Sequence, residues 1–307
     1  GMLGDDLSSV NKKKSIVLAS ISVLAFLSCA HEDEMSVKDP DSEIVTIYAS
    51  SEGVPMVRNV IDDGSLSITW TSGDAINVFF GASESSKFVT SQSGEVAQFK
   101  GSIDVVTGGG EGLDDDTSLW GIYPYDEDNT CDGTYVTLTL PAVQPAAENT
   151  FANALFPQIA RSRNFYMSFY NLCGCFRFSV TAPDIRYVTF AGNNNEIIAG
   201  KVSVSMDTTP VVHEVISGET ELKMYAPDGG YFVPGVHYYL VVFPGTFSEG
   251  MTITYYKDSS CASYRHSKSY TLGRGVVSRF AGKDAGLTFE DIPLVDWEEG
   301  DKISGEI

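Results

Sequence analysis

Alternation of apolar and polar residues with a period of two dominates this chain from Glu43 onward. Other readable segments are short apolar runs, and Gly, Pro, Asn, Asp or Ser bounds nearly all of them. A period of two places successive side chains on opposite faces of a strand. Helix signals are scarce, and the best candidate for a helical turn is the segment from Asn149 to Ile159. The pattern predicts an all-β fold.

The expected strands form two series, and we place a domain boundary at Ala182-Pro183-Asp184 between them. In the last strand before it, Phe176, Phe178 and Val180 are expected to face the core, and the alternate side chains solvent. The apolar run 238–243 lacks alternation and is expected to be covered on both faces. The segment 107–116, rich in Gly and Asp, is expected to be an exposed loop. The expected strands are 44–48, 66–70, 76–80, 119–123, 135–140, 172–180, 187–191, 200–204, 221–225, 238–243, 251–256 and 268–272.

The charge balance narrows the possible partners. The formal net charge is −21 and the sequence pI is about 4.4. Nucleic-acid binding requires clustered Lys and Arg, so we expect no nucleic-acid partner. With 43% hydrophobic residues in 307, the chain can build a substantial core, and its length favours two domains.

Residues 12–29 resemble an export signal. Three lysines precede the apolar stretch 15–27, and Cys29 follows Leu27-Ser28. As a helix this stretch would be about 20 Å long, too short for a hydrocarbon core of about 30 Å. The pattern is typical of a signal peptide, and the cysteine resembles a lipobox in which Phe26 and Leu27 depart from the commonest residues. We therefore expect a bacterial lipoprotein with lipid on Cys29; an ordinary signal peptide with an incidental thiol is the alternative.

The other four cysteines are Cys131, Cys173, Cys175 and Cys261. Cys173 and Cys175 are two residues apart on an expected strand, about 6.5 to 7 Å, which is at the limit of disulfide geometry. We expect buried free thiols there. The four histidines show no ligand spacing, so neither a metal site nor a cofactor is expected.

Signals for catalysis are absent from the sequence. No nucleophile elbow, P-loop, dinucleotide fingerprint or His-Glu-x-x-His pattern occurs, so an enzyme is not expected. The segment 126–133 is similar to a calcium loop in composition but lacks its regular spacing, and a solvated turn is favoured. Trp120, Tyr123 and Tyr125 could stack on a sugar, yet Trp120 and Tyr123 should point to opposite faces of their strand, which favours core packing.

Several segments together resemble the fimbrillin superfamily of Bacteroidota, the pilins and pilin-like lipoproteins that include the Mfa-like group. They run in the family's order and cover about residues 44–282. The segments are Trp70-Thr71-Ser72-Gly73-Asp74-Ala75-Ile76-Asn77-Val78, Gly121-Ile122-Tyr123-Pro124-Tyr125, Val136-Thr137-Leu138-Thr139-Leu140-Pro141 with Gln144, Phe243-Pro244-Gly245-Thr246-Phe247, Gly250-Met251-Thr252-Ile253-Thr254 and Leu272-Gly273-Arg274-Gly275.

This resemblance implies two transthyretin-like β-sandwich domains in tandem, at 44–182 and 183–291. They would follow a signal peptide, 1–29, and an acidic linker, 30–43. It also implies that a trypsin-like protease cuts between Arg58 and Asn59 and removes the first strand, 44–50. Another subunit's strand would then take its place. The tail, 292–307, is the expected donor strand, with Ile292, Leu294, Val295 and Trp297 as its apolar residues.

Two functions are compatible with these features. The first is a stalk or tip subunit of a fimbria at the cell surface, tethered to the outer membrane through Cys29 before proteolysis and strand exchange with other fimbrial subunits. The alternative is a non-polymerising surface lipoprotein that keeps its lipid and first strand and acts as a pilus anchor or as a carbohydrate- or host-binding adhesin.

Overall fold

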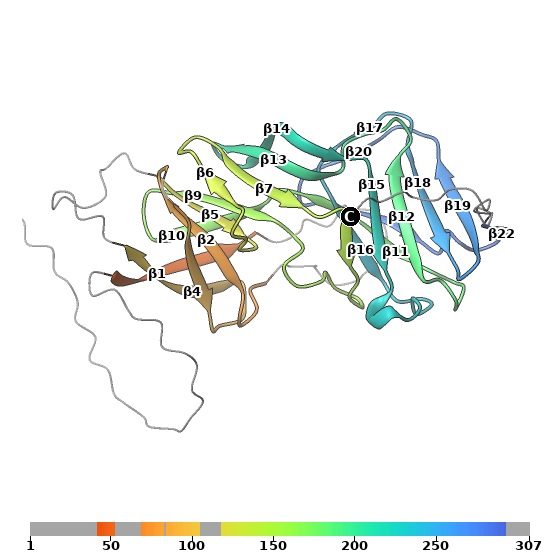
Figure 1. Ribbon diagram of the computed structural model, residues 1–307, viewed down its shortest axis with the longest axis horizontal. Helices are drawn as coiled ribbons and strands as arrows, with labels where there is room; N and C mark the ends of the chain where they lie inside the picture. Colours follow the sequence, from red (N-terminus) through yellow and green to blue (C-terminus); the bar gives the residue numbers. More distant parts are fainter. Residues whose placement is uncertain (1–41, 53–68, 83, 105–117, 293–307) are drawn as a thin grey trace, which may run out of the picture. The chain divides into compact units, whose positions relative to one another are not determined.

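The computed structural model describes residues 42–52, 69–82, 84–104 and 118–292 (Figure 1). Strands make up most of these residues, and a single 3-10 turn, η1 (Pro227–Gly229), is the only helical element among them. The all-β prediction is confirmed. The described part of the chain includes no helix of the length and apolar character needed to cross a membrane.

Seven strands from the first part of the chain form a sheet that closes on itself. Every neighbouring pair in this barrel is antiparallel except β1 and β10, the first and last of the seven strands in the sequence, which are parallel. In order around the barrel the strands are β1 (Ser42–Ser51), β10 (Tyr166–Asn171), β9 (Gln158–Ser162), β5 (Leu119–Tyr123), β2 (Ala75–Phe80), β3 (Ser86–Thr90) and β4 (Val96–Asp104).

The remaining strands form four smaller sheets (Figure 1). The largest has the order β22 (Glu290–Asp291), β19 (Ser260–His266), β18 (Met251–Tyr256), β12 (Tyr187–Gly192), β15 (Glu221–Tyr225), β8 (Val143–Pro145). The others are β14 (Pro210–Glu219), β13 (Ala199–Met206), β7 (Val136–Leu140), β6 (Thr130–Cys131); β16 (Tyr238–Val242), β11 (Gly174–Ser179), β21 (Val277–Ala281); and β17 (Gly245–Phe247), β20 (Tyr270–Leu272).

Strand pairing crosses the position where we placed a domain boundary. β7 and β8 precede residue 182 but pair with β13 and β15, which follow it. β11 also precedes it and pairs with β16 and β21. The boundary between residues 182 and 183 therefore does not coincide with a break in hydrogen bonding, and the tandem transthyretin-like arrangement stays a prediction.

Two hydrophobic clusters form the core. One fills the barrel and centres on Trp70, Phe88 and Phe99. The other is larger and extends from the outer face of β5, through Trp120, to the strands of the carboxy-terminal part. Trp120 and Tyr123 thus belong to different clusters, as expected for residues on opposite faces of one strand.

Two local expectations are wrong. The segment from Asn149 to Ile159 is not helical: Asn149 and Ala154 both have φ near +57°, in the left-handed region that a right-handed helix excludes, and the chain then enters β9. The second concerns β11, which is buried on both faces, including Arg177 and Ser179. Cys175, on the same face of β11 as these two residues, belongs to the large hydrophobic cluster, so this face is packed against other parts of the chain and does not meet solvent.

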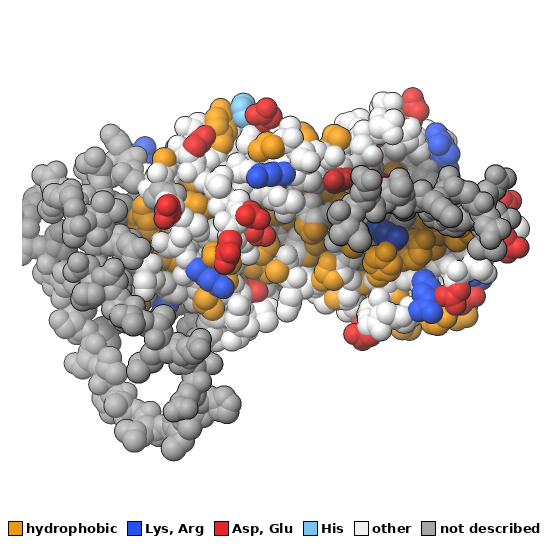
Figure 2. All heavy atoms as spheres, in the orientation of Figure 1, with side chains coloured by type: hydrophobic (Ala, Val, Ile, Leu, Met, Phe, Trp, Pro, Cys, Tyr) orange, Lys and Arg blue, Asp and Glu red, His pale blue; other side chains and the backbone are white. Residues whose placement is uncertain are grey.

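Other local expectations hold. β16, from the run without alternation, is buried at every position. Cys173 and Cys175 are buried free thiols, and Cys131 and Cys261 are free and partly exposed. The expected loop 107–116 lies outside the described residues. On the face in Figure 2, acidic side chains are spread over the surface with basic ones scattered among them.

The first strand as candidate functional site

Most of the site residues expected from sequence lie outside the described part of the chain. These are Cys29, Arg58, Asn59, Leu294, Val295 and Trp297. Ile292 is described: it follows β22, and its N–H donates to the carbonyl oxygen of Ser259, 2.9 Å away. The expected donor tail therefore starts beside the last strand of the six-stranded sheet. The strand expected to be removed, 44–50, is present as β1.

β1 lies between β4 and β10, and we call this place the first-strand position. With β4 it is antiparallel over nine residues, from Ser42 opposite Asp104 to Ser50 opposite Val96. With β10 it is parallel, from Tyr48 opposite Tyr166 to Ser51 opposite Phe169. Because both edges of β1 are paired, the strand closes the barrel. Taking it away would leave unpaired main-chain groups on both β4 and β10.

Side chains of β1 alternate between the barrel interior and its outside. Ile47 and Ala49 are fully buried in the barrel core, whereas Ile44 and Tyr48 are 59% and 38% exposed. Tyr48 stacks on Tyr166 of β10, with ring centroids 5.0 Å apart. Burial of one Ile side chain contributes about 1.5 to 3 kcal/mol. With few buried apolar side chains, β1 depends largely on main-chain hydrogen bonds for its attachment.

Trp70 packs beneath β1 and fixes it by a hydrogen bond. Its indole Nε1–H donates to the carbonyl oxygen of Ala49, 3.2 Å away. The ring makes edge-to-face contacts with Phe99, Tyr123 and Phe169 at centroid distances of 5.0 to 5.4 Å. Trp70 thus connects the barrel core directly to the main chain of the first strand, which explains a tryptophan in the Trp-Thr-Ser-Gly-Asp segment.

Asp74 connects two of the fimbrillin-like segments. One carboxylate oxygen accepts a hydrogen bond from the Thr71 N–H at 2.8 Å and closes the turn that contains Gly73, whose φ is +98°. The other accepts from the Tyr123 hydroxyl at 3.2 Å. Burial, and next the Asp74 carboxylate, raise the pKa of Tyr123 well above its ordinary value, so this hydroxyl stays protonated and donating.

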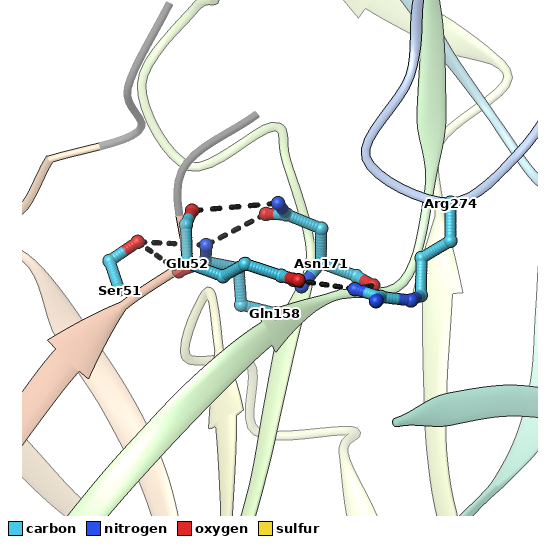
Figure 3. Close-up of polar contacts among 5 residues, drawn as sticks. All are labelled: Ser51, Glu52, Gln158, Asn171 and Arg274. Carbon is cyan, nitrogen blue, oxygen red and sulfur yellow. Dashed lines mark hydrogen bonds and ion pairs between the residues drawn. The ribbon is translucent and has the colours of Figure 1, made fainter. Parts of the chain in front are cut away.

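A polar network holds the carboxy-terminal end of β1 (Figure 3). The Ser51 hydroxyl and the Gln158 side chain hydrogen bond at 3.1 Å, and Gln158 Nε2 donates to Asn171 Oδ1 at 2.8 Å. Glu52 comes directly after β1, and its carboxylate accepts from the Asn171 N–H at 2.9 Å and from Arg274 at 2.5 Å. Gln158 and Asn171 are fully buried.

Sequence reasoning did not find this network. Arg274 lies in one of the fimbrillin-like segments, Leu272-Gly273-Arg274-Gly275, but the sequence predicted no contact or function for it. Gln158 and Asn171 are single polar residues within otherwise apolar stretches. A polar side chain at a position where the pattern calls for an apolar one is the signal that could have identified them, since buried polar groups are hydrogen bonded.

The residues considered for sugar or calcium binding have other contacts. Trp120 is fully buried and Tyr123 is 8% exposed, so neither offers a free ring face. The ammonium of Lys87 lies 4.6 Å from the centroid of the Tyr125 ring. In the turn at 126–133, Asn129 Nδ2 donates to the Asn77 side chain, and the Asp132 carboxylate accepts two main-chain N–H groups. These groups serve the structure of the turn.

No protein-family model matches the sequence, and a search of curated proteins found no match. Solved structures with a similar backbone include a candidate cell adhesion protein from Bacteroides ovatus, with a TM-score of 0.46, 15% identity and coverage of 82% of this chain and 96% of that one. A second, from Bacteroides uniformis, has a TM-score of 0.45, 14% identity and coverage of 83% and 98%.

A third similar structure is the tip fimbrial protein Mfa3 from Porphyromonas gingivalis, with a carboxy-terminal truncation. Its TM-score is 0.37 and its identity 7%, with coverage of 81% of this chain and 98% of that one.

Proposed function

We propose that this chain is a stalk or tip subunit of a cell-surface fimbria. In this proposal it is exported as a lipoprotein through Cys29, cut after Arg58, and joined to another subunit by exchange of β1 for that subunit's strand. The observation that carries the proposal is the position of β1, which is hydrogen bonded on both edges and closes the barrel. Other fimbrial subunits, a trypsin-like protease and the outer membrane are the proposed partners.

The bonding of β1 suits exchange for another strand. Main-chain hydrogen bonds to β4 and β10 are available to any extended segment, whatever its sequence. Side-chain selectivity comes from the positions that point inward, of which Ile47 and Ala49 are fully buried. A strand with apolar side chains of this size at two alternate positions can therefore form hydrogen bonds with both β4 and β10 and fill the space that Ile47 and Ala49 occupy in the core.

Loss of β1 without replacement would be costly. It would leave the Trp70 indole N–H without its acceptor on Ala49, along with the unpaired edges of β4 and β10. A barrel opened in this way has a strong tendency to take up another strand. Proteolysis behind β1 would thus commit the subunit to assembly.

The proposal is tested by the variant Arg58→Ala in cells that make the native protein. We expect mature chains with Asn59 as the first residue and surface polymers from the wild type, and unpolymerised chains that still begin at lipidated Cys29 from the variant. Arg163→Ala, at an exposed arginine between β9 and β10, is the control and should assemble normally. Equal polymerisation of Arg58→Ala, with chains beginning at Cys29, would contradict the proposal.

A further inference from the structure

We propose that the first-strand position selects its occupant by charge: Arg274 and the Asn171 N–H form a carboxylate-binding site for an acidic residue just beyond the strand. The inference rests on the proposed exchange of β1 and specifies the chemistry of the strand that enters. The partner strand is expected to carry Asp or Glu three residues after its last fully buried side chain, where β1 carries Glu52 after Ala49.

The binding groups do not belong to β1, so they remain when β1 leaves. Asn171 ends β10, and Arg274 lies in the turn between β20 and β21 (Figure 3). The Arg274 guanidinium also donates to the carbonyl oxygen of Asn171, at 3.1 Å, which holds it beside the end of β10. Two donors are thus placed together by parts of the chain that are about 100 residues apart.

The location of the carboxylate is set by main-chain pairing. The Glu52 N–H donates to the carbonyl oxygen of Phe169 at 2.9 Å, which continues the parallel pairing of β1 with β10. If another extended segment pairs with β10 in the register of β1, its residue at the position of Glu52 lies beside Arg274 and the Asn171 N–H. The Arg274 and Asn171 donors at this point then make binding of the segment depend on whether that residue is acidic, neutral or basic.

Partial burial makes the site selective for the charge of the residue that it binds. The side chains of Glu52 and Arg274 are each 25% exposed, and Asn171 is fully buried. A guanidinium and an N–H held in such surroundings interact strongly with a carboxylate. A neutral side chain of the same length can accept the hydrogen bonds but lacks the negative charge, and a shorter side chain leaves the donors without an acceptor. Lys or Arg at the same point would place two positive charges together. The site therefore favours acidic strands and rejects basic ones.

The test uses the full chain nicked at an inserted protease site directly after Glu52, so that the fragment carrying β1 stays bound without a covalent link. A fluorescent peptide of residues 42–52 with an amidated carboxy terminus is the probe, and the same amidated peptide with Glu52→Gln is its partner probe. The measured quantities are the equilibrium displacement of the fragment and the apparent Kd of each peptide, at low and at high salt.

We expect the Glu peptide to bind at least tenfold more tightly than the Gln peptide, with a smaller difference at high salt. In the Arg274→Gln protein the preference should disappear. The control Arg265→Gln changes an exposed arginine on β19 and should keep the preference. The comparison of the two peptides on the unmodified protein needs no variant, so a folding defect of Arg274→Gln would not obscure it.

The outcomes separate this inference from the proposed function. Equal binding of both peptides to the unmodified protein would overturn the carboxylate site and leave strand exchange intact. A preference that persists in a folded Arg274→Gln protein would also overturn it. Failure of both peptides to displace the fragment, even after long incubation, would contradict strand exchange itself and the carboxylate site with it.

Discussion

Gln144 exchanges two hydrogen bonds with the main chain of Val241. Its Nε2 donates to the Val241 carbonyl oxygen at 2.7 Å, and the Val241 N–H donates to Oε1 at 2.9 Å. The Gln144 side chain is buried. Its amide thus pairs with β16 as a neighbouring strand would and joins β8 to a sheet to which β8 does not belong. This contact gives a structural reason for the Leu-Pro…Gln segment.

Replacing this glutamine should destabilise the protein. Gln144→Leu removes both hydrogen bonds and leaves the N–H and carbonyl of Val241 buried without partners, each at a cost of about 1 to 3 kcal/mol. We expect the free energy of unfolding to fall by about 2 to 4 kcal/mol in urea denaturation. Val143→Ala, at the exposed neighbouring residue, should change it by less than about 0.5 kcal/mol. Equal stability of Gln144→Leu and wild type would refute this role.

Trp70→Phe should loosen the first strand selectively. The variant keeps an aromatic ring in the barrel core but loses the donor to the Ala49 carbonyl. We expect faster amide hydrogen exchange across β1 and a loss of about 1 to 3 kcal/mol in stability. Trp120→Phe is the matched control, because its Nε1 has no hydrogen-bond partner among the described residues. If both variants accelerate exchange in β1 equally, the indole bond has no special role.

The buried thiols of Cys173 and Cys175 should not react with alkylating reagents in the native protein. Burial raises the pKa of both Cys173 and Cys175 above the ordinary range, so almost no thiolate is present near neutral pH. We expect iodoacetamide at pH 8 to modify the partly exposed Cys261 while these two stay unmodified, as resolved by peptide mass spectrometry. All should react after unfolding in guanidinium chloride. Rapid native labelling of Cys173 would contradict the tight core seen around it.

Tyr255 should make the fold sensitive to alkali. Burial raises the pKa of its hydroxyl far above 10, its ordinary value. The folded state therefore binds the proton of this hydroxyl more tightly than the unfolded chain does. The contribution of the proton to the free energy of unfolding is complete below about pH 10 and is lost as the pH rises further. Above pH 10 this loss is about 1.4 kcal/mol per pH unit.

The corresponding variant is Tyr255→Phe, compared by urea denaturation at pH 7 and pH 11. The Tyr255 hydroxyl has no hydrogen-bond partner within the described segments, so the stability at pH 7 should change little. At pH 11 the variant should exceed wild type by about 1 kcal/mol. Tyr166→Phe, at a tyrosine that is 69% exposed, should not reduce the alkaline loss. An unchanged slope in Tyr255→Phe would show that other groups determine it.

Many strand positions followed from sequence because the signal for them is local, but β3, β4, β9, β10, β14, β19 and β21 were not among the expected strands. The segments 119–123, 221–225 and 251–256 agree with β5, β15 and β18 to the residue. In β18 the buried and partly exposed side chains alternate, as period two requires. β14 was missed because eight of its ten residues are exposed, including Val211 and Ile216, so its pattern shows no buried face.

The prediction of which side chains are buried failed where packing against other parts of the chain decides burial, and not the strand's own pattern. β11 alternates apolar and polar residues, yet Arg177 and Ser179 are buried because their face of the strand, with Cys175, is packed against the large hydrophobic cluster. The segment 149–159 was the best candidate for a helical turn, but Leu155 and Phe156 reach the core from a chain that turns at Asn149 and Ala154. Local pattern carries no information on which other elements cover a segment.

The amino-acid sequence by itself determined that this chain is built of strands and that the first of them includes residues 44–48. The tertiary structure decided that β1 closes a barrel between β4 and β10, and that Glu52 meets Asn171 and Arg274 at its end. The reason is physical. Alternation is a property of adjacent residues, whereas Glu52 and Arg274 are 222 residues apart, and main-chain hydrogen bonds between distant strands do not depend on side-chain identity.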